Sequence, residues 1–145
     1  MNIFTEAGNR FLADYERYGE AREKAIGELE SIRQFCEMGV VFFYKAITDG
    51  GRPDVYVTRK QENLVTIEFG PRPCGFDLVR TGPMAAVLVS PEGSLVLASR
   101  SGWMQDSDQQ MKSRTIGTDH WDTTIASWLI DFIQDSEGEY RRLHH

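Results

Sequence analysis

The segment 84–100, which reads MAAVLVSPEGSLVLASR, limits the possible folds more than any other part of the sequence. Two apolar runs, 84–89 and 95–98, flank the tetrapeptide Ser90-Pro91-Glu92-Gly93. Proline presets φ for the second position of a turn, and glycine accepts the positive φ that closes a short hairpin loop. Because Val, Leu and Ala occupy successive positions in both arms, we expect both faces to be covered. The segment therefore predicts the central hairpin of an antiparallel sheet with helices packed on its faces.

The N-terminal segment 1–37 has a helical pattern and contains no proline. Apolar or aromatic residues recur every seven positions and so share one face, at Phe4, Phe11, Tyr18, Ala25 and Ile32. A single helix over this segment would be about 50 Å long at 1.5 Å per residue. A helix of that length would extend beyond the domain, and its far end would need a partner. Because glycine weakens a helix by roughly 1 kcal/mol relative to alanine, we expect a break or kink near Gly19.

The middle of the chain predicts the rest of the sheet. Gly39 is expected to end the helical segment, and 40–48 is expected to be a strand because it is rich in β-branched and aromatic residues. Further strands are expected over 55–60 and 64–70, with a short edge strand over 76–80. The predicted fold class is α+β, with an antiparallel sheet of five or six strands over 40–100 and N-terminal and C-terminal helical elements packed on it. At 145 residues, the chain fits one domain spanning 1–145.

The C-terminal third of the chain is expected to form a loop, a helix and a tail. Segment 101–118 mixes polar residues with Trp103 and Met104 and is predicted to be a loop, unless the hairpin continues through 103–105. Segment 119–136 has the clearest helical pattern, with Asp119 as N-cap and Asp122 completing a start that resembles a capping box. Segment 137–145 is polar and is expected to fray.

The predicted helix over 119–136 has a wider apolar arc than one sheet requires. At 100° per residue, its apolar side chains span roughly 200°, whereas packing on one sheet needs about 100°. Ile130 lies at the far edge of this arc, and Ala126 and Ile133 extend the same edge. With Trp103 and Met104, these residues form our candidate partner-binding set, which would contact a partner protein or a second copy of the chain.

Composition excludes several classes of partner. The net charge is −6, and the acidic excess lies in the two terminal segments, so the basic footprint that nucleic acids require is missing. Acidic membrane surfaces are disfavoured for the same reason, and no apolar run approaches the roughly 20 residues needed to cross a bilayer. No signal peptide pattern is visible, and Cys36 and Cys74 lack metal-ligand or disulfide-rich spacing. We therefore expect a cytoplasmic protein with reduced cysteines.

The familiar catalytic motifs do not occur in the sequence. There is no glycine-rich phosphate loop, no G-x-S-x-G elbow and no H-E-x-x-H pair. The best catalytic constellation is His120 between Asp119 and Asp122, with Cys74 as a nucleophile, but helix capping by the aspartates explains the same residues. A metal cluster of Asp106, Asp108, Asp119, His120 and Asp122 lacks ligand spacing. We therefore predict no catalytic, cofactor-binding or metal-binding residues, and no cofactor.

Two functions remain open. In size, acidity and helix–sheet–helix layout the chain resembles bacterial secretion chaperones and toxin-neutralising immunity proteins. This resemblance implies a non-catalytic protein-interaction module that binds a partner protein or forms a homodimer. The alternative is a small-molecule-binding or enzymatic α+β domain with its site between sheet and helices, for which the aromatic residues of 42–44, Tyr56 and Phe69 would line a pocket.

Overall fold

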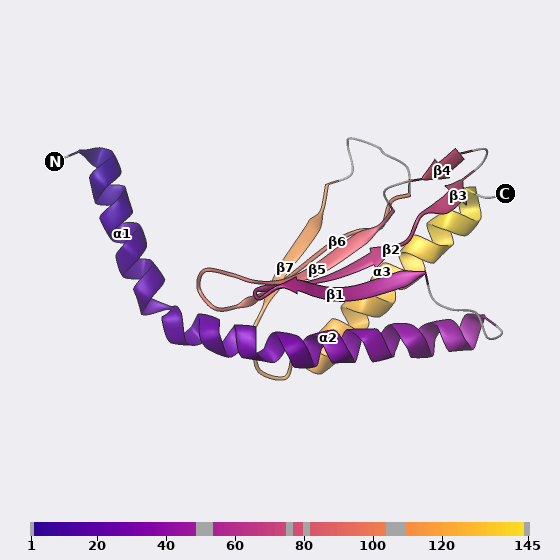
Figure 1. The fold of residues 1–145 in the computed structure, drawn as a ribbon, viewed down its shortest axis with the longest axis horizontal. Helices are drawn as coiled ribbons and strands as arrows, with labels where there is room; N and C mark the ends of the chain where they lie inside the picture. The colour runs from indigo at the N-terminus through magenta and orange to yellow at the C-terminus, as the bar shows by residue number, and fades with distance from the viewer. Residues whose placement is uncertain (1, 49–53, 75–76, 80–81, 104–109, 144–145) are drawn as a thin grey trace.

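The described residues form one antiparallel sheet, a small two-stranded sheet and three helices (Figure 1). The computed structural model describes residues 2–48, 54–74, 77–79, 82–103 and 110–143. The helices are α1 (Ile3–Arg17), α2 (Gly19–Ile47) and α3 (Trp121–Leu143). The strands are β1 (Val55–Gln61), β2 (Leu64–Phe69), β3 (Arg72–Cys74), β4 (Asp77–Val79), β5 (Met84–Val89), β6 (Leu95–Arg100) and β7 (Lys112–Ile116). The predicted α+β class is confirmed.

The main sheet has five antiparallel strands in the order β1-β2-β5-β6-β7, so β5 is its central strand. The predicted hairpin is formed by β5 and β6, with Val87 opposite Leu97 and Leu88 opposite Val96. At its tip, the Ser90 amide donates to the Ser94 carbonyl, and Gly93 has a φ of 85°. The turn therefore uses glycine at the position that requires left-handed backbone. Strands β3 and β4 form the separate two-stranded sheet.

Helices α2 and α3 pack on the same face of the main sheet. The expectation that helices cover both faces was therefore wrong. Helix α2 contacts β1, β2 and β5, while α3 contacts β6. Alternate strand residues, including Val65, Val87 and Leu97, belong to the same buried cluster as the helix side chains. Side chains at the intervening positions point to the opposite face. The continuous apolar runs of β5 and β6 therefore do not indicate a sheet covered on both sides.

Helix α2 extends through the segment that was predicted to be a strand. Segment 40–47 is helical, and Gly39 lies inside the helix rather than at its end. The reason is packing: Val40 and Tyr44 continue, at four-residue spacing, the buried stripe that includes Cys36. The β propensity of this segment is outweighed by burial of that stripe. The break between α1 and α2 falls at Tyr18, beside Gly19, which confirms the predicted kink.

The C-terminal segments also differ from expectation. The predicted loop 101–118 contains strand β7, which pairs with β6, while 104–109 lies outside the described residues. The predicted tail is helical as far as Leu143, because Ser136 and Glu137 are buried and Tyr140 packs against the core. Helix α3 begins at Trp121, so His120 rather than Asp119 immediately precedes it. None of the helices in the described ranges is long and apolar enough to cross a membrane.

Candidate protein-binding surfaces

Helix α1 is an arm that projects from the rest of the molecule (Figure 1). None of its 15 residues is buried. It begins at an Asn2 cap, whose side-chain oxygen accepts a 2.7 Å hydrogen bond from the Phe4 amide. Helices this short are marginal in water when they pack on nothing. The arm is therefore a helix with a sequence-encoded start but with little tertiary packing of its own.

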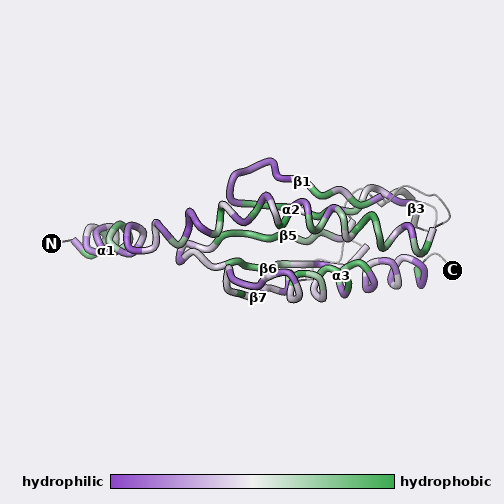
Figure 2. The backbone as a smooth tube through the Cα atoms, turned by 90° about the horizontal axis from the view of Figure 1, so that it is seen from below, coloured by the Kyte–Doolittle hydropathy of each residue, from purple (hydrophilic) through white to green (hydrophobic). Residues whose placement is uncertain are grey.

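The exposed side chains of α1 form one apolar stripe. Phe4, Phe11 and Tyr15 lie within about 40° of one another at 100° per residue, and their exposed fractions are 82%, 62% and 48%. The rings of Phe11 and Tyr15 stack with centroids 5.9 Å apart. We call these three residues the α1 stripe. Figure 2 shows hydrophobic and hydrophilic positions alternating along this helix. An aromatic stripe exposed to this extent is a strong candidate for a protein contact.

The tip of the β5–β6 hairpin fixes the junction between α1 and α2. A Cβ on Gly93 would lie 2.5 Å from the backbone carbon and Cβ of Ala21, so the tip touches α2 closely. The Arg22 guanidinium donates a 2.9 Å hydrogen bond to the Pro91 carbonyl and lies 3.5 Å from the centroid of the Tyr15 ring. These contacts hold the C-terminal end of the α1 stripe toward the hairpin.

A notch separates this part of the α1 stripe from the hairpin tip. Its volume is about 390 Å³, and its walls are Phe11, Asp14, Tyr15 and Tyr18 on the helical side and Pro91 and Glu92 on the hairpin side. Phe11 and Tyr15 therefore face an open space beside the hairpin tip.

The uncovered face of the main sheet is the second apolar surface. Leu64, Leu88 and Val96 lie side by side across β2, β5 and β6, and all three are half-buried. The next row across the same strands consists of Thr66, which is half-buried, and Ala86 and Ala98, which are buried. These six residues define what we call the outer sheet face. Among the described elements, no helix packs on it, since α2 and α3 contact the opposite face.

The residues predicted to bind a partner do not form one surface. Trp103 is fully buried, and its ring nitrogen donates a 2.7 Å hydrogen bond to the Ser136 carbonyl. Ile133 is buried and Ala126 is half-buried, whereas Ile130 is 46% exposed. The wide apolar arc of α3 is explained by its packing against both the sheet and α2. Met104 lies outside the described residues, and partner binding at Ile130 stays a prediction.

A buried ionic cluster joins β3, α2 and α3, and sequence reasoning missed it. Arg72 donates hydrogen bonds of 2.9 and 2.8 Å to the two carboxylate oxygens of Glu137, which also accepts from the Tyr44 hydroxyl. The Arg72 guanidinium lies 5.1–5.3 Å from the ring centroids of Phe69, Trp103 and Tyr140. The two partners are 65 residues apart, so no local motif could reveal the pair.

The protonation of this cluster favours a structural role. Burial disfavours ionisation of Glu137, but hydrogen bonds from Arg72 and Tyr44 outweigh that effect and hold the pKa of the carboxyl below its usual value. Burial, together with the hydrogen bond to Glu137, raises the pKa of the Tyr44 hydroxyl. A strongly paired carboxylate and a tyrosine that resists ionisation are poorly suited to exchange protons near neutral pH. The cluster fastens the β3–β4 hairpin to the helices.

Of the residues weighed for catalysis or metal binding, Asp106, Asp108 and the side chain of Cys74 lie outside what the structure describes. Burial raises the pKa of the Cys36 thiol to about 12, which leaves it unreactive. His120 is exposed, and the Asp119 carboxylate accepts a 3.0 Å hydrogen bond from Lys24. Within the ranges that the structure describes, no group of three or more potential ligands could hold a metal ion. Of the aromatic residues expected to line a pocket, Phe42 and Tyr56 are exposed whereas Tyr44 and Phe69 are in the core.

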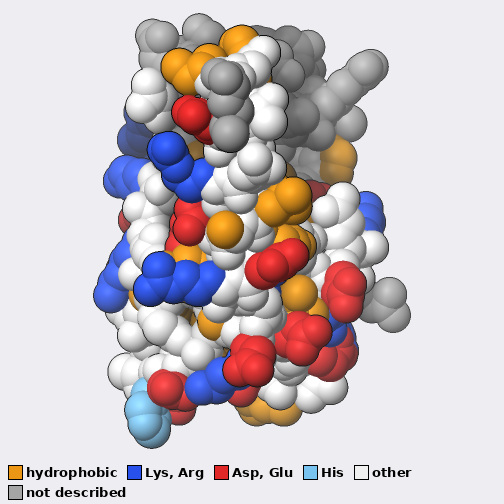
Figure 3. All heavy atoms as spheres, turned by 90° about the vertical axis from the view of Figure 1, so that its left-hand side faces the viewer, with side chains coloured by type: hydrophobic (Ala, Val, Ile, Leu, Met, Phe, Trp, Pro, Cys, Tyr) orange, Lys and Arg blue, Asp and Glu red, His pale blue; other side chains and the backbone are white. Residues whose placement is uncertain are grey.

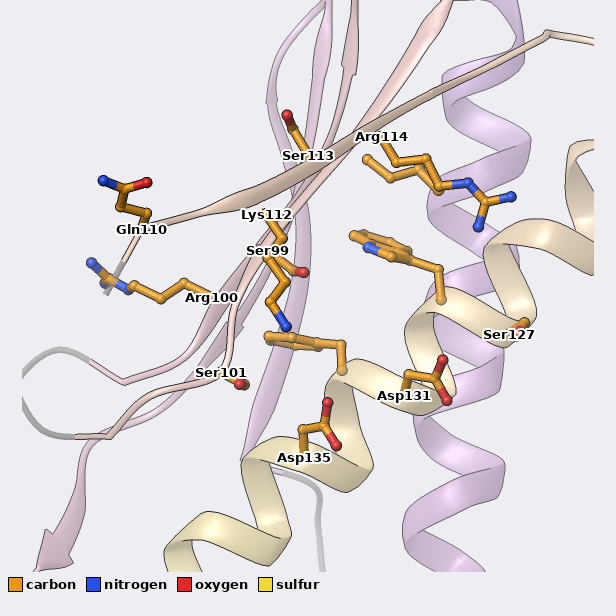
Figure 4. Close-up of a pocket in the computed structure, with 13 residues that line it drawn as sticks. Ser99, Arg100, Ser101, Gln110, Lys112, Ser113, Arg114, Ser127, Asp131 and Asp135 are labelled. Atoms are coloured by element: carbon orange, nitrogen blue, oxygen red, sulfur yellow. The ribbon is translucent and has the colours of Figure 1, made fainter. Parts of the chain in front are cut away.

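An open groove of about 510 Å³ lies between β6–β7 and α3 (Figure 4). Lys112 and Arg114 extend from β7 toward α3, which presents Asp131 and Asp135 to the same groove. Because β7 is an edge strand, inward-pointing charged side chains at these positions discourage pairing with another strand. The charged side chains of the groove therefore discourage strand pairing at the β7 edge, and the groove is large enough for a small polar ligand.

The end of the molecule that bears α1 has a mixed surface. Figure 3 shows basic and acidic side chains interspersed there, with hydrophobic side chains between them. Interspersed charges keep a surface soluble while leaving apolar contacts available. No family model, curated protein or solved structure matches this chain.

Proposed function

We propose that the protein is a non-catalytic protein-interaction module that uses the α1 stripe as its principal contact. The observation that supports this is the complete exposure of α1, in which no residue is buried and two phenylalanines are more than 60% exposed. Aromatic residues are enriched at protein interfaces, where a few well-packed side chains contribute most of the binding energy. A helix that presents its apolar face in this way is suited to docking on an apolar surface of another protein.

Site-specific photo-crosslinking in living cells tests this proposal. A photo-reactive amino acid replaces Phe11, and a matched variant has it at Asn9, which is exposed about 160° around the same helix. We expect a discrete covalent adduct from position 11, a much weaker one from position 9, and loss of the position-11 adduct when Phe4 is changed to serine. Equal yields at both positions, or no adduct at either, would contradict the proposal.

The groove between β6–β7 and α3 supports a second candidate, a small-molecule-binding or enzymatic domain. The groove, of about 510 Å³, is lined by three cationic side chains and two carboxylates. This arrangement suits a small ligand that carries both charges. A thermal-shift screen with free amino acids and short dipeptides tests this function. Stabilisation by one of these compounds that disappears in Lys112→Ala would favour it, and a flat screen would remove its support.

A further inference from the structure

We infer that the partner of the α1 stripe is the outer sheet face of a second copy of this chain, in a reciprocal two-fold dimer. This inference rests on the proposed function and names its partner. Each copy would contribute one helix and one sheet face, so the two contacts would be identical by symmetry. The same chain has both surfaces, and neither is covered by another described element.

The packing of α2 shows that such a helix fits this sheet. Phe4 and Phe11 of α1 belong to a seven-residue repeat that continues in α2 at Ala25 and Ile32. In α2 these positions are fully buried in the core that includes the inner face of the sheet. The repeat is therefore covered by a sheet in one helix and exposed to solvent in the other. The outer sheet face offers the α1 stripe a second apolar surface on the same strands, with Leu64, Leu88 and Val96 half-buried.

The two surfaces also match in length. Helix α1 has 15 residues and β5 and β6 have six each, which correspond to lengths of about 22 Å and about 20 Å. The aromatic side chains of the α1 stripe expose roughly 400 Å². Counting both sides of two reciprocal contacts, the stripes would bury about 800 Å² and the outer sheet faces, in which Ala86 and Ala98 are already buried, about 500 Å². The total of about 1,300 Å² lies at the lower end of the range for stable protein interfaces.

The connection between α1 and α2 favours contact with a second copy over folding back. Helix α2 packs on the inner face, and its first turn is held against the hairpin tip by the close approach of Gly93 to Ala21. Only Tyr18 separates the two helices. One residue spans about 3.6 Å, far less than the roughly 20 Å between helix layers on opposite faces of a sheet. The α1 stripe therefore cannot reach the outer sheet face of its own chain while α1 stays helical.

Sedimentation velocity with a pair of complementary variants tests the dimer. Phe11→Glu places a charge in the α1 stripe, and Val96→Glu places one in the outer sheet face. We expect wild type to sediment at twice the 16.5 kDa chain mass and each variant alone to sediment as a monomer. An equimolar mixture should recover a heterodimer, because it has one intact helix–sheet contact. Asn9→Glu, on the opposite side of α1, should remain dimeric.

Each alternative gives a different result. A monomeric wild type at every accessible concentration overturns the dimer, while the photo-adduct at position 11 still decides the proposed function, since its mass would then be that of another protein. If Phe11→Glu is monomeric but Val96→Glu is dimeric and folded, α1 pairs with something other than the outer sheet face, which also overturns the inference. Should Val96→Glu fail to fold by circular dichroism, Thr66→Lys replaces it in the same mixing experiment.

Discussion

Helices α1 and α2 follow one another in the chain and share a seven-residue apolar repeat, yet they have opposite environments. In α2 the repeat is buried, with Ala25 and Ile32 fully inaccessible. In α1 the same repeat is exposed, and no residue of the helix is buried. The difference shows that periodicity identifies the apolar face of a helix, whereas the rest of the fold determines whether that face is buried.

The two helices also differ in how firmly they are held. Helix α2 is attached along the sheet and again near its C-terminal end, where Tyr44 donates to Glu137. Helix α1 is held at its C-terminal end alone, through Tyr15 and Arg22. Stability in proteins is distributed unevenly, and helices with few buried contacts open most easily. Substitutions should therefore have smaller effects on the free energy of unfolding the nearer they lie to the exposed helix α1.

The largest effect is expected at the far end of α2, in the Arg72–Glu137 pair. Arg72→Met removes both hydrogen bonds to Glu137 and leaves that carboxylate buried beside Tyr44. Breaking a buried ion pair in this way costs about 3–5 kcal/mol. Urea denaturation should show the loss as a lower midpoint. The double variant Arg72→Met with Glu137→Gln should recover much of it, because no buried charge then lacks a partner; a double variant as unstable as the single one would contradict this account.

This pair also marks the limit of sequence-based prediction for the protein. The β5–β6 hairpin and the break near Gly19 were predicted correctly, because turn chemistry and glycine act over a few residues. The Arg72–Glu137 pair depends on contacts between residues 65 positions apart. Strand β7 was missed because its five residues are mostly polar and it lies at the edge of the sheet.

The predictions of a strand over 40–48 and of a partner-binding surface that includes Trp103 and Ile133 were wrong for a related reason. The residues of 40–47 favour a strand by composition, but their burial against the sheet and α3 favours a helix. Likewise, Ile133 and Trp103 belong to apolar patterns that could face a partner, and the structure places both in the core. The α1 stripe was visible in the sequence as part of a repeat. Only the arrangement of the elements shows that this part of it is uncovered.

The second-largest effect is expected in the middle of α2. Leu29 is fully buried in the core against the sheet, so Leu29→Ala should leave a cavity and destabilise the protein by about 3 kcal/mol. Thermal unfolding followed by circular dichroism measures the change. Leu12→Ala is the matched control in α1, since Leu12 is 57% exposed. A comparable loss in the control would show that α1 is packed within the monomer and that the contrast between the helices is wrong.

A smaller effect is expected where the two helices meet the hairpin. Gly93 has a φ of 85° and lies against Ala21, with no room for a Cβ. Gly93→Ala combines backbone strain with this clash and should cost about 2 kcal/mol. Hydrogen exchange should locate the loss in the first turn of α2 and in the hairpin tip. Gly27, where an added Cβ meets nothing within 4 Å, provides the control, and Gly27→Ala should stabilise the helix by roughly 1 kcal/mol.

The smallest effect is expected in the α1 stripe itself. Phe11→Ala removes a ring that is 62% exposed and stacks on Tyr15. Surface substitutions of this kind change the free energy of unfolding by about 0.5 kcal/mol or less. That value should hold for the monomer, measured at a protein concentration low enough to dissociate any dimer. At high concentration the proposed dimer would stabilise the wild type, because binding to the folded state stabilises it. Phe11→Ala should therefore melt at a lower temperature than the wild type under that condition. A melting temperature that falls equally at both concentrations would mean that Phe11 supports the fold and not an interface.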